Sequence, residues 1–363
     1  HPEYPAGGTG RREQQKNDPG IGTMPPRKIG VITVDRSDWG HLRLLCEAIH
    51  QASDLELQLF SREDWSKQCP DPMPPLTKTF YVPRSGGGPC SVTRAMAVAL
   101  SGCGFIFDDW RPDILVILGD RFEMLAATMA SLPFAIPILH LHGGELTAGA
   151  FDNQSRMAIS KMAHVHCVAN PHAATVLTGM GETNIFVTGC MALDRFAQPP
   201  LTRQETADAL QLEVRARWVV VMFHTATLHW QSVDEQIKSL ESVLNEESGQ
   251  RIYFLPNQDT HADRIQAFMT AEQEFSHLRS GCAQRGSDCY VTVLPDRLYC
   301  SLLQHAAVLV GNSSALKIEA PFIGLRTREV TDRQFGRGTF YGYGKSVPQV
   351  LKVLQTMSLE AIK

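Results

Sequence analysis

Acidic and basic side chains gather at the ends of two short apolar segments, residues 114–118 and 136–141. They are Asp120, Arg121 and Glu123 after the first segment, and His140, His142 and Glu145 in and after the second. Asp152 follows a few residues later. Carboxylates that share a cleft raise one another's pKa values, which suits them to donate and accept protons near neutral pH. The cluster therefore indicates general acid–base chemistry, although solvated loop acids, or a helix N-cap at Asp152, would produce the same pattern.

His140, His142 and Glu145 are also residue types that bind metal ions. No further set of ligands lies near them in the sequence. We therefore expect no metal ion here, and nothing in the chain calls for a redox cofactor.

A second stretch suited to chemistry is Gly311-Asn312-Ser313-Ser314, which lies between an apolar segment and a helix start expected at residues 315–320. Backbone amides and hydroxyls at a helix N-terminus bind anions and suit a pyrophosphate. An ordinary serine N-cap has the same sequence. Arginines in both halves of the chain can neutralise phosphate charge, namely Arg36, Arg121, Arg333 and Arg337. Any one of these arginines alone is more often a surface cation. The prediction of a phosphate site therefore depends on the four arginines together.

His224 directly follows another apolar segment, residues 218–223. A neutral imidazole at the end of a strand can act as an acid, as a base or as a hydrogen-bond donor to a diphosphate. A structural histidine fits the local sequence equally well.

Short apolar segments alternate with helical periodicity along most of the chain. Buried strands are expected at 28–34, 55–60, 114–118, 136–141, 165–169 and 185–188, and again at 218–223, 251–255, 291–294 and 308–311. This alternation predicts doubly wound parallel sheets of the α/β class, which bind ligands at the carboxyl ends of their strands. Residues 61–89 break the pattern and are expected to form a long loop.

A chain of 363 residues is too long for one ordinary core, so we expect two Rossmann-like domains. The expected boundaries are a disordered extension at 1–26, a first domain at 27–197, a nucleotide-binding domain at 201–338, and a helix within 345–360 that crosses back to the first domain. The linker contains Gln198-Pro199-Pro200. The ligand cleft is then expected between the two domains.

The composition is that of a soluble globular protein, with 43% hydrophobic and 20% charged residues and a net charge of −4. No basic segment interleaves with aromatic residues, so no nucleic-acid partner is expected. The apolar runs are far shorter than a membrane span, so no membrane partner is expected either. Nine scattered cysteines without a CxxC spacing indicate reduced thiols and a cytoplasmic protein.

Taken together, the motifs resemble those of the hydrolysing UDP-N-acetylglucosamine 2-epimerases, a family that includes the epimerase domain of the animal bifunctional enzyme. In the first half the matching segments are 119–123, 140–145, Asp152 with Arg156, 161–164 and 189–194. In the second half they are 224–227, 256–259, 311–314 with Glu319, 332–337 and 341–344. The resemblance covers about residues 27 to 354.

This resemblance implies a glycosyltransferase-B-like pair of Rossmann domains with a UDP-sugar in the cleft. It also implies removal of the sugar C2 proton, anti elimination of UDP to a glycal, and hydration to N-acetylmannosamine for sialic acid synthesis. The catalytic positions carried over are Asp120 and Asp152 for proton transfer, His142 or Glu145 where family members differ, and His224 for UDP departure. The expected substrate- and UDP-binding residues are Arg36, Ser314, Glu319 and Arg333, which match family positions, together with Arg121, Asn257 and Ser313. No cofactor and no metal is implied.

Three alternatives stay open at this point. The same fold can act on UDP-2,4-diacetamido-2,4,6-trideoxyglucose, as in legionaminic acid routes. A glycosyltransferase of this fold would need an acceptor site and would lack the acids at Asp120 and Asp152. A catalytically degenerate nucleotide-sugar-binding protein is the third, because a strand and helix that family members carry before Tyr341 are reduced here to Gly338-Thr339-Phe340. The resemblance also implies a homodimer or homotetramer.

Overall fold

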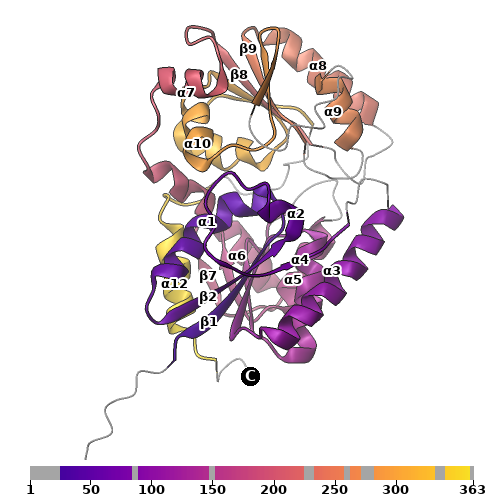
Figure 1. The fold of residues 1–363 in the computed structure, drawn as a ribbon, viewed down its shortest axis with the longest axis vertical. Coiled ribbons are helices and arrows are strands. Elements are labelled where there is room, and N and C mark those ends of the chain that lie inside the picture. The colour runs from indigo at the N-terminus through magenta and orange to yellow at the C-terminus, as the bar shows by residue number, and fades with distance from the viewer. Residues whose placement is uncertain are drawn as a thin grey trace, which may run out of the picture.

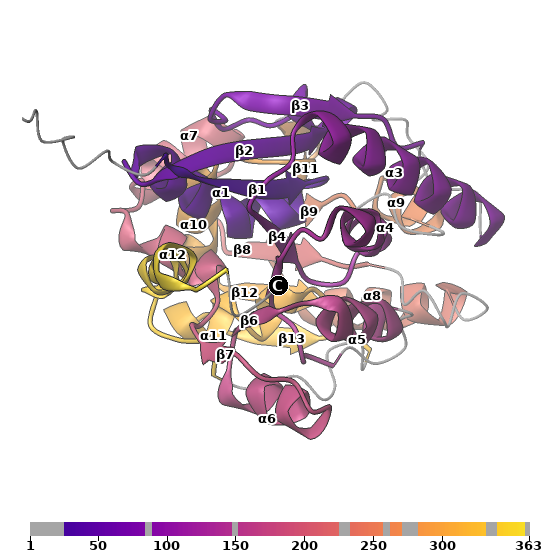
Figure 2. The ribbon, with the colours of Figure 1, turned by 90° about the horizontal axis from the view of Figure 1, so that it is seen from below.

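The computed structural model describes residues 25–83, 89–146, 152–224, 233–256, 262–270, 282–331 and 340–359. Within these ranges the chain forms two α/β halves, each built around one sheet, and the halves lie one above the other along the long axis (Figure 1). Figure 2 shows helices on both faces of the first sheet. The expected α/β class with two doubly wound sheets is confirmed.

The first sheet has seven strands in the order β3-β2-β1-β4-β5-β6-β7, all paired in parallel. Its strands are β1 (Arg27–Thr33), β2 (Leu55–Arg62), β3 (Leu76–Phe80), β4 (Ile114–Leu118), β5 (Ile138–Leu141), β6 (Val165–Val168) and β7 (Ile185–Val187). The helices of this half are α1 (Arg36–Gln51), α2 (Glu63–Ser66), α3 (Pro89–Asp109), α4 (Phe122–Ser131), η1 (Leu132–Phe134), α5 (Asp152–Met162), α6 (Pro171–Gly179) and η2 (Met191–Ala197). Every residue of β4 is buried, as expected for a strand covered on both faces.

The second sheet has the order β10-β11-β9-β8-β12-β13. Its strands are β8 (Trp218–Met222), β9 (Gln250–Phe254), β10 (Cys282–Arg285), β11 (Asp288–Val291), β12 (Val308–Gly311) and β13 (Thr327–Glu329). The helices that follow η2 are α7 (Arg203–Leu210), α8 (Val233–Glu246), α9 (Ala262–Thr270), α10 (Asp296–His305), η4 (Ser314–Leu316), α11 (Glu319–Ile323) and α12 (Ser346–Thr356). All pairs are parallel except β10 with β11, which form an antiparallel edge.

The sheets depart from the sequence expectations at the edge strand β3 and around β11, which lies next to the edge strand β10. Residues 76–80, expected within a loop, form the edge strand β3, in which Phe80 is the one buried side chain. The strand expected at 291–294 lies at 288–291 instead, and residues 282–285 pair with it as β10. Edge strands bury few side chains, so their apolar signal in the sequence is weak.

Helix α1 begins at Arg36, directly after the corner that follows β1. Asp38 accepts hydrogen bonds from the backbone N–H groups of Val34 and Asp35, both at 3.0 Å. This contact satisfies backbone donors at the strand–helix corner, as a cap does, so the helix begins directly at Arg36.

The last described helix, α12, packs on the first half of the molecule rather than the second (Figure 1). Asp194 accepts hydrogen bonds from the backbone N–H groups of Ser346 at 2.9 Å and Val347 at 2.8 Å, and so caps α12 from a distant part of the chain. Val350 and Leu354 are fully buried in the same apolar core as Leu42 of α1. The described chain therefore begins and ends in one half.

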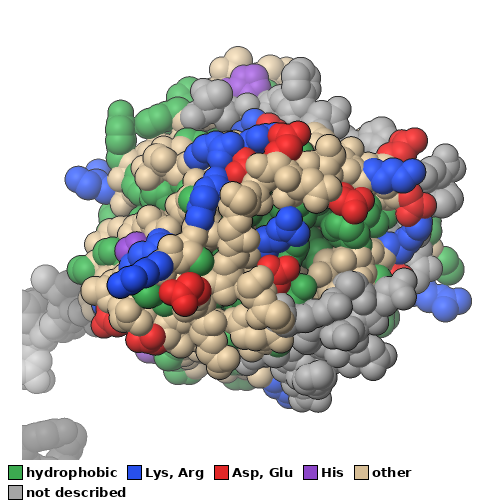
Figure 3. Space-filling model, turned by 90° about the horizontal axis from the view of Figure 1, so that it is seen from above, with side chains coloured by type: hydrophobic (Ala, Val, Ile, Leu, Met, Phe, Trp, Pro, Cys, Tyr) green, Lys and Arg blue, Asp and Glu red, His purple; other side chains and the backbone are tan. Residues whose placement is uncertain are grey.

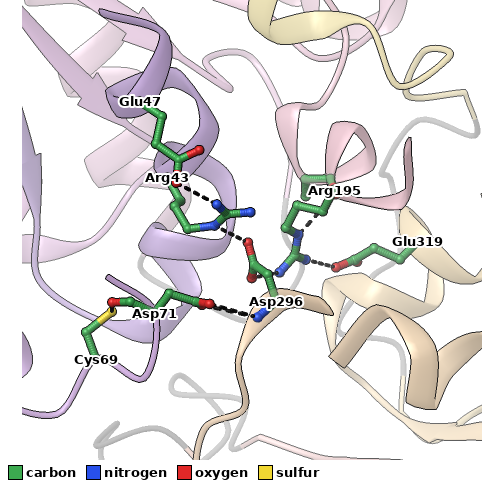
Figure 4. Close-up of polar contacts among 8 residues, drawn as sticks. Arg43, Glu47, Cys69, Asp71, Arg195, Asp296 and Glu319 are labelled. Atoms are coloured by element: carbon green, nitrogen blue, oxygen red, sulfur yellow. Dashed lines mark hydrogen bonds and ion pairs between the residues drawn. The ribbon is translucent and has the colours of Figure 1, made fainter. Parts of the chain in front are cut away.

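One carboxylate joins the two halves. Asp296, the first residue of α10, accepts from Arg43 Nε of α1 at 2.7 Å and from Arg195 Nη1 of η2 at 3.0 Å (Figure 4). Arg195 Nη2 donates in turn to Glu319 Oε1 at 3.0 Å. The Arg43, Asp296 and Arg195 side chains are each only about a tenth exposed. Burial of this kind is tolerable only because each charge has its partner.

By length and composition alone, α3 is apolar enough to cross a membrane, and it is the one described helix that meets this test. The same composition suits a helix that packs in a protein core. Ala99, Cys103 and Phe107 of α3 are buried in the apolar cluster between helix and sheet. Phe105, in contrast, is 74% exposed.

Replacing Asp296 by alanine would leave two buried guanidinium groups without their shared carboxylate. Because Glu47 and Glu319 remain as partners, we expect the loss to lie at the lower end for a broken buried pair, about 3 kcal/mol in the free energy of unfolding. Urea denaturation measures this quantity. The matched control is Asp234→Ala, which removes the exposed partner of Arg264 and should cost less than about 1 kcal/mol. Equal losses from the two changes would contradict the role given to Asp296.

Candidate active site

The carboxyl ends of β4 and β5 lie beside each other and carry most of the acid–base residues expected from the sequence. The two strands pair in parallel, with Leu118 next to Leu141. Asp120 and His142 come one or two residues later and therefore reach the same edge of the sheet. This is the edge at which parallel sheets bind ligands.

A buried cation organises this edge. Arg156 of α5 donates from Nη2 to the Asp120 carboxylate and from Nη1 to the Glu145 carbonyl, the latter at 2.6 Å. The Arg156 side chain is 3% exposed, whereas that of Asp120 is 20% exposed. Asp152 is the first residue of α5 and precedes Arg156 by one helical turn. One helix thus presents both Asp152 and the arginine that orients Asp120.

His142 and Glu145 form a buried pair. His142 leaves β5 with a left-handed backbone conformation, φ 59°, and its Nδ1 lies 3.5 Å from Glu145 Oε2. Asn170 Nδ2 donates to the other oxygen of Glu145 at 3.3 Å. Burial lowers the pKa of His142, but its interactions with the Cys190 side chain and the Glu145 carboxylate outweigh burial and raise that pKa to about 10. At this separation the two side chains form a buried ion pair when His142 is protonated.

Gly144 makes the tight turn between these two residues possible. Its φ is +78°, and a Cβ atom there would lie 2.4 Å from the Ala173 carbonyl oxygen. Glycine alone tolerates both conditions.

His140 is a structural histidine. One ring nitrogen, Nε2, lies 2.8 Å from the Gly119 carbonyl, which can only accept, so Nε2 carries the proton. Nδ1 then accepts from the Ser160 hydroxyl at 3.0 Å. The ring is fully buried, and burial lowers the pKa of His140 to about 3. Both nitrogens are occupied and the ring stays neutral.

Arg121 pairs with a neighbouring carboxylate rather than with the cavity described below. Its Nε and Nη2 both lie 3.2 Å from the Glu123 carboxylate, and Arg62 Nη1 approaches the same group at 3.7 Å. Arg121 is not among the described residues that line the cavity.

A cavity of about 150 Å³ lies between the two halves. Its wall includes five of the residues expected to bind substrate or to act on it, namely Arg36, His224, Ser313, Ser314 and Glu319. The rest of the wall consists of residues for which the sequence predicts no role, among them Trp39, His41, Trp65, Asp71, Arg195, Phe254, Asp296 and Tyr299. Both halves contribute to the wall, so the cavity depends on how the halves meet.

Asn312 fixes the segment that carries His224. Its side chain accepts from the His224 N–H and donates to the His224 carbonyl, both at 2.8 Å, and it is fully buried. Gly311 has φ +144°, and a Cβ there would lie 1.8 Å from the Met222 carbonyl oxygen. This close approach of β12 to β8 brings Ser313 and Ser314 next to the end of the strand that carries His224.

The helix expected at residues 315–320 is not continuous. The structure has a three-residue 3-10 turn, η4, followed by the five-residue helix α11. Ser313 caps the turn by accepting from the Ala315 N–H at 3.4 Å, which is the ordinary capping alternative. So short an element supplies amide donors but little aligned dipole for binding an anion.

Two predicted binding residues already have protein partners. Glu319 Oε1 accepts from Arg195 at 3.0 Å and from the Tyr299 hydroxyl at 3.2 Å. Arg36 Nη2 donates to the Leu255 carbonyl in the other half. Asn257, Arg333 and Arg337 lie outside the described residues.

His41 links the cavity to the acid–base edge. It lines the cavity, and its ring centroid lies 5.0 Å from that of His142 in an edge-to-face arrangement. His41 Nδ1 also lies 3.6 Å from Cys190 Sγ. The one sequence signal for His41 was its position just after the first strand, at the carboxyl edge. Nothing in the sequence pairs it with Cys190.

On the outer face of the second half, the described residues carry charged side chains of both signs. Figure 3 shows basic and acidic side chains interspersed there. Glu247, for example, pairs with Arg217 and Arg326. This half therefore presents mixed charge rather than a basic surface.

The chain matches one protein-family model and several named relatives in sequence. The family model described as UDP-N-acetylglucosamine 2-epimerase matches residues 85–358. A Campylobacter jejuni protein named GDP/UDP-N,N'-diacetylbacillosamine 2-epimerase (hydrolyzing) is 30% identical over 330 residues, which are 86% of this chain and 83% of that protein. A Neisseria meningitidis protein named UDP-N-acetylglucosamine 2-epimerase is 30% identical over 327 residues, 86% of this chain and 81% of that protein.

A solved structure has the same fold. The crystal structure of a UDP-GlcNAc 2-epimerase from Neisseria meningitidis bound to UDP-GlcNAc matches 91% of this chain and 100% of its own, with a TM-score of 0.72 and 10% identity. At this identity the likeness concerns the fold alone.

The neutral, buried state of His140 predicts how stability depends on pH. Its pKa is about 3 in the folded chain against 6.5 when exposed, so between these values the unfolded chain binds the extra proton. The contribution of His140 is fully present above pH 6.5 and is lost as the pH falls toward 3, by at most about 1.4 kcal/mol per pH unit. We expect His140→Gln to reduce this slope in urea denaturation between pH 6.5 and 4. An unchanged slope would contradict neutral burial.

Proposed function

Since the chain belongs to the family of hydrolysing UDP-N-acetylglucosamine 2-epimerases, we propose that it converts UDP-N-acetylglucosamine and water into N-acetylmannosamine and UDP. One observation carries the proposal. Asp120, Arg156, Glu145, His142 and His41 form an unbroken series of contacts from the acid–base edge to the cavity wall. Proton-transfer groups of one half thus adjoin a cavity whose other wall carries His224.

In the first step of this mechanism, a base removes the C2 proton of the sugar. The C–H electron pair forms the C1–C2 double bond, and the C1–O bond breaks to release UDP. We assign the base to the carboxylates at the edge of the first sheet, Asp120 and Asp152. Arg156 supports this role for Asp120, because a buried cation favours the ionised carboxylate and holds it in one orientation.

In the second step, water adds across the double bond of the glycal. The hydroxyl joins C1 and a proton returns to C2 on the opposite face, which inverts that centre. We assign this delivery to Glu145, whose Oε2 lies 3.5 Å from His142 Nδ1. The water molecule that supplies the hydroxyl at C1 also releases a proton, and this proton restores the acid for the next turnover.

Departure of UDP needs groups that stabilise the diphosphate. We assign this role to His224, Ser313 and Ser314 from the second half and to Arg36 from the first, with Asn257 and Arg333 as further binding residues. Glu319 is proposed to accept from the ribose hydroxyls. Its Oε1 is held by two donors, and this orients the carboxylate as a whole.

A second substrate is favoured by the Campylobacter relative, whose name specifies N,N'-diacetylbacillosamine. A UDP-2,4-diacetamido-2,4,6-trideoxy sugar differs at C4 and C6, away from the bonds that break at C1 and C2. The same acid–base groups therefore serve both substrates. The residues that contact C4 and C6 of the sugar determine which of the two substrates is preferred.

In a cell we propose a cytoplasmic enzyme that supplies sialic acid synthesis. All nine cysteines are free thiols in the structure, as a reducing compartment requires. We also propose a homodimer or homotetramer on the basis of the family.

Incubation with each UDP-sugar in deuterated water tests the reaction. For UDP-N-acetylglucosamine we expect UDP and N-acetylmannosamine carrying deuterium at C2, because the proton that returns comes from solvent. Proton NMR observes both products. Faster turnover of the diacetamido sugar would make it the substrate. Broadening of the UDP signals without formation of product would show that the protein binds UDP but is not an enzyme.

Asp120→Asn tests the proton-transfer role. Loss of one general acid or base typically lowers the rate by about 10²–10⁴-fold, so we expect a fall of kcat in this range with little change in UDP affinity measured by calorimetry. Asp113→Asn is the control, since Asp113 binds the Lys28 N–H at the other end of β4. Parallel loss of UDP binding and thermal stability in the Asp120 variant would make Asp120 structural.

A further inference from the structure

Three potential metal ligands meet behind the cavity wall. They are His41 at the start of α1, His142 after β5, and Cys190 just before η2. One ligand atom from each lies within 4.8 Å of the other two. His142 and Cys190 are buried, and His41 is partly buried. The three come from sequence positions that nothing in the sequence connects.

The spacing fits a tetrahedral zinc ion. With Zn–S near 2.3 Å and Zn–N near 2.1 Å, tetrahedral geometry places sulfur and nitrogen about 3.6 Å apart. The observed separation of Cys190 Sγ from His41 Nδ1 is 3.6 Å. An ordinary hydrogen bond between the same groups would satisfy this single distance as well. The arrangement of the third ligand, His142, therefore distinguishes a metal site from a hydrogen bond.

His142 has the arrangement of a metal-bound histidine. Its Nδ1 faces the Glu145 carboxylate at 3.5 Å, and its Nε2 is buried without a hydrogen-bond partner among the described residues. In zinc proteins a ligating histidine commonly binds the metal through one nitrogen and a carboxylate through the other. Asn170 holds Glu145 in place at 3.3 Å. The outer partner of the ligand is therefore itself fixed.

A nucleophilic cysteine is the competing interpretation of a thiol beside a histidine. A nucleophile has to reach the substrate, and reactive thiols are partly exposed. Cys190 is fully buried and points to the two imidazoles rather than to an open surface. Coordination explains a buried thiol between two histidines better than nucleophilic attack does.

We propose that His41, His142 and Cys190 bind one divalent transition-metal ion, with zinc as the best fit to a ligand set of two imidazoles and one thiolate. Three protein ligands leave a fourth position for water or for an oxygen of a molecule in the cavity, which His41 also lines. The sequence predicts no metal site here, because His142 lies next to His140 and Glu145 in it and no further ligand is near. His140 has both nitrogens occupied, and Glu145 is the outer partner of His142.

The test uses the full-length protein, freed of metal with a chelator and then titrated with Zn²⁺ or Co²⁺ alone, without any nucleotide sugar. We expect one ion per chain by calorimetry and elemental analysis. The Co²⁺ form should show tetrahedral d–d absorption together with a thiolate-to-cobalt charge-transfer band. A weak octahedral spectrum without the thiolate band would overturn the proposal.

Matched variants identify the ligands. Cys190→Ser should abolish the thiolate band, whereas Cys46→Ser, which alters another fully buried thiol in the core, should leave it intact. Glu145→Gln should weaken Zn²⁺ binding by about 10–100-fold as the loss of an outer partner. If Cys190→Ser does not fold, His41→Gln at the partly buried position provides the test. Unchanged Zn²⁺ stoichiometry in the His41→Gln variant would refute the site.

Discussion

The carboxylate of Asp296 between Arg43 and Arg195 is the contact on which the rest of the structure depends. It fixes how the two halves meet, and so defines the cavity between them. The same two arginines also neighbour the candidate metal ligands in sequence. Arg43 follows His41 on α1, and Arg195 follows Cys190 in and around η2. The elements α1 and η2, which carry these two arginines, thus also carry or adjoin His41 and Cys190.

Two histidines near one sheet edge show that environment decides what a residue type does. His140 and His142 are two positions apart, yet the pKa of the first falls to about 3 and that of the second rises to about 10. The difference comes from their neighbours. His140 meets a carbonyl and a hydroxyl in a buried site, whereas His142 meets a carboxylate and a thiol. The left-handed turn at His142 is what separates the two surroundings.

The central strands and the acid–base edge could be predicted because their signals are local. A strand buried on both faces, such as β4, is an unbroken apolar run, and the residues that follow it must lie at the carboxyl edge. Edge strands such as β3 bury too little to leave that signal. Cys190 and His41 lie 149 positions apart, so only the folded chain brings them together. Asn257 and Arg333 were expected from the resemblance and lie outside the described residues.

Placing α12 on the first half has a consequence for how the protein is made. Val350 and Leu354 of α12 complete the core around Leu42, and Asp194 of the first half caps the N-terminus of α12. On a ribosome the chain emerges from its N-terminus, so this core stays open until the whole second half has been synthesised. Apolar surface on α1 is then exposed to solvent for most of translation, and such surface is what chaperones bind and what drives aggregation. A ribosome that stalls late would release a nearly complete chain whose first half is still unfinished.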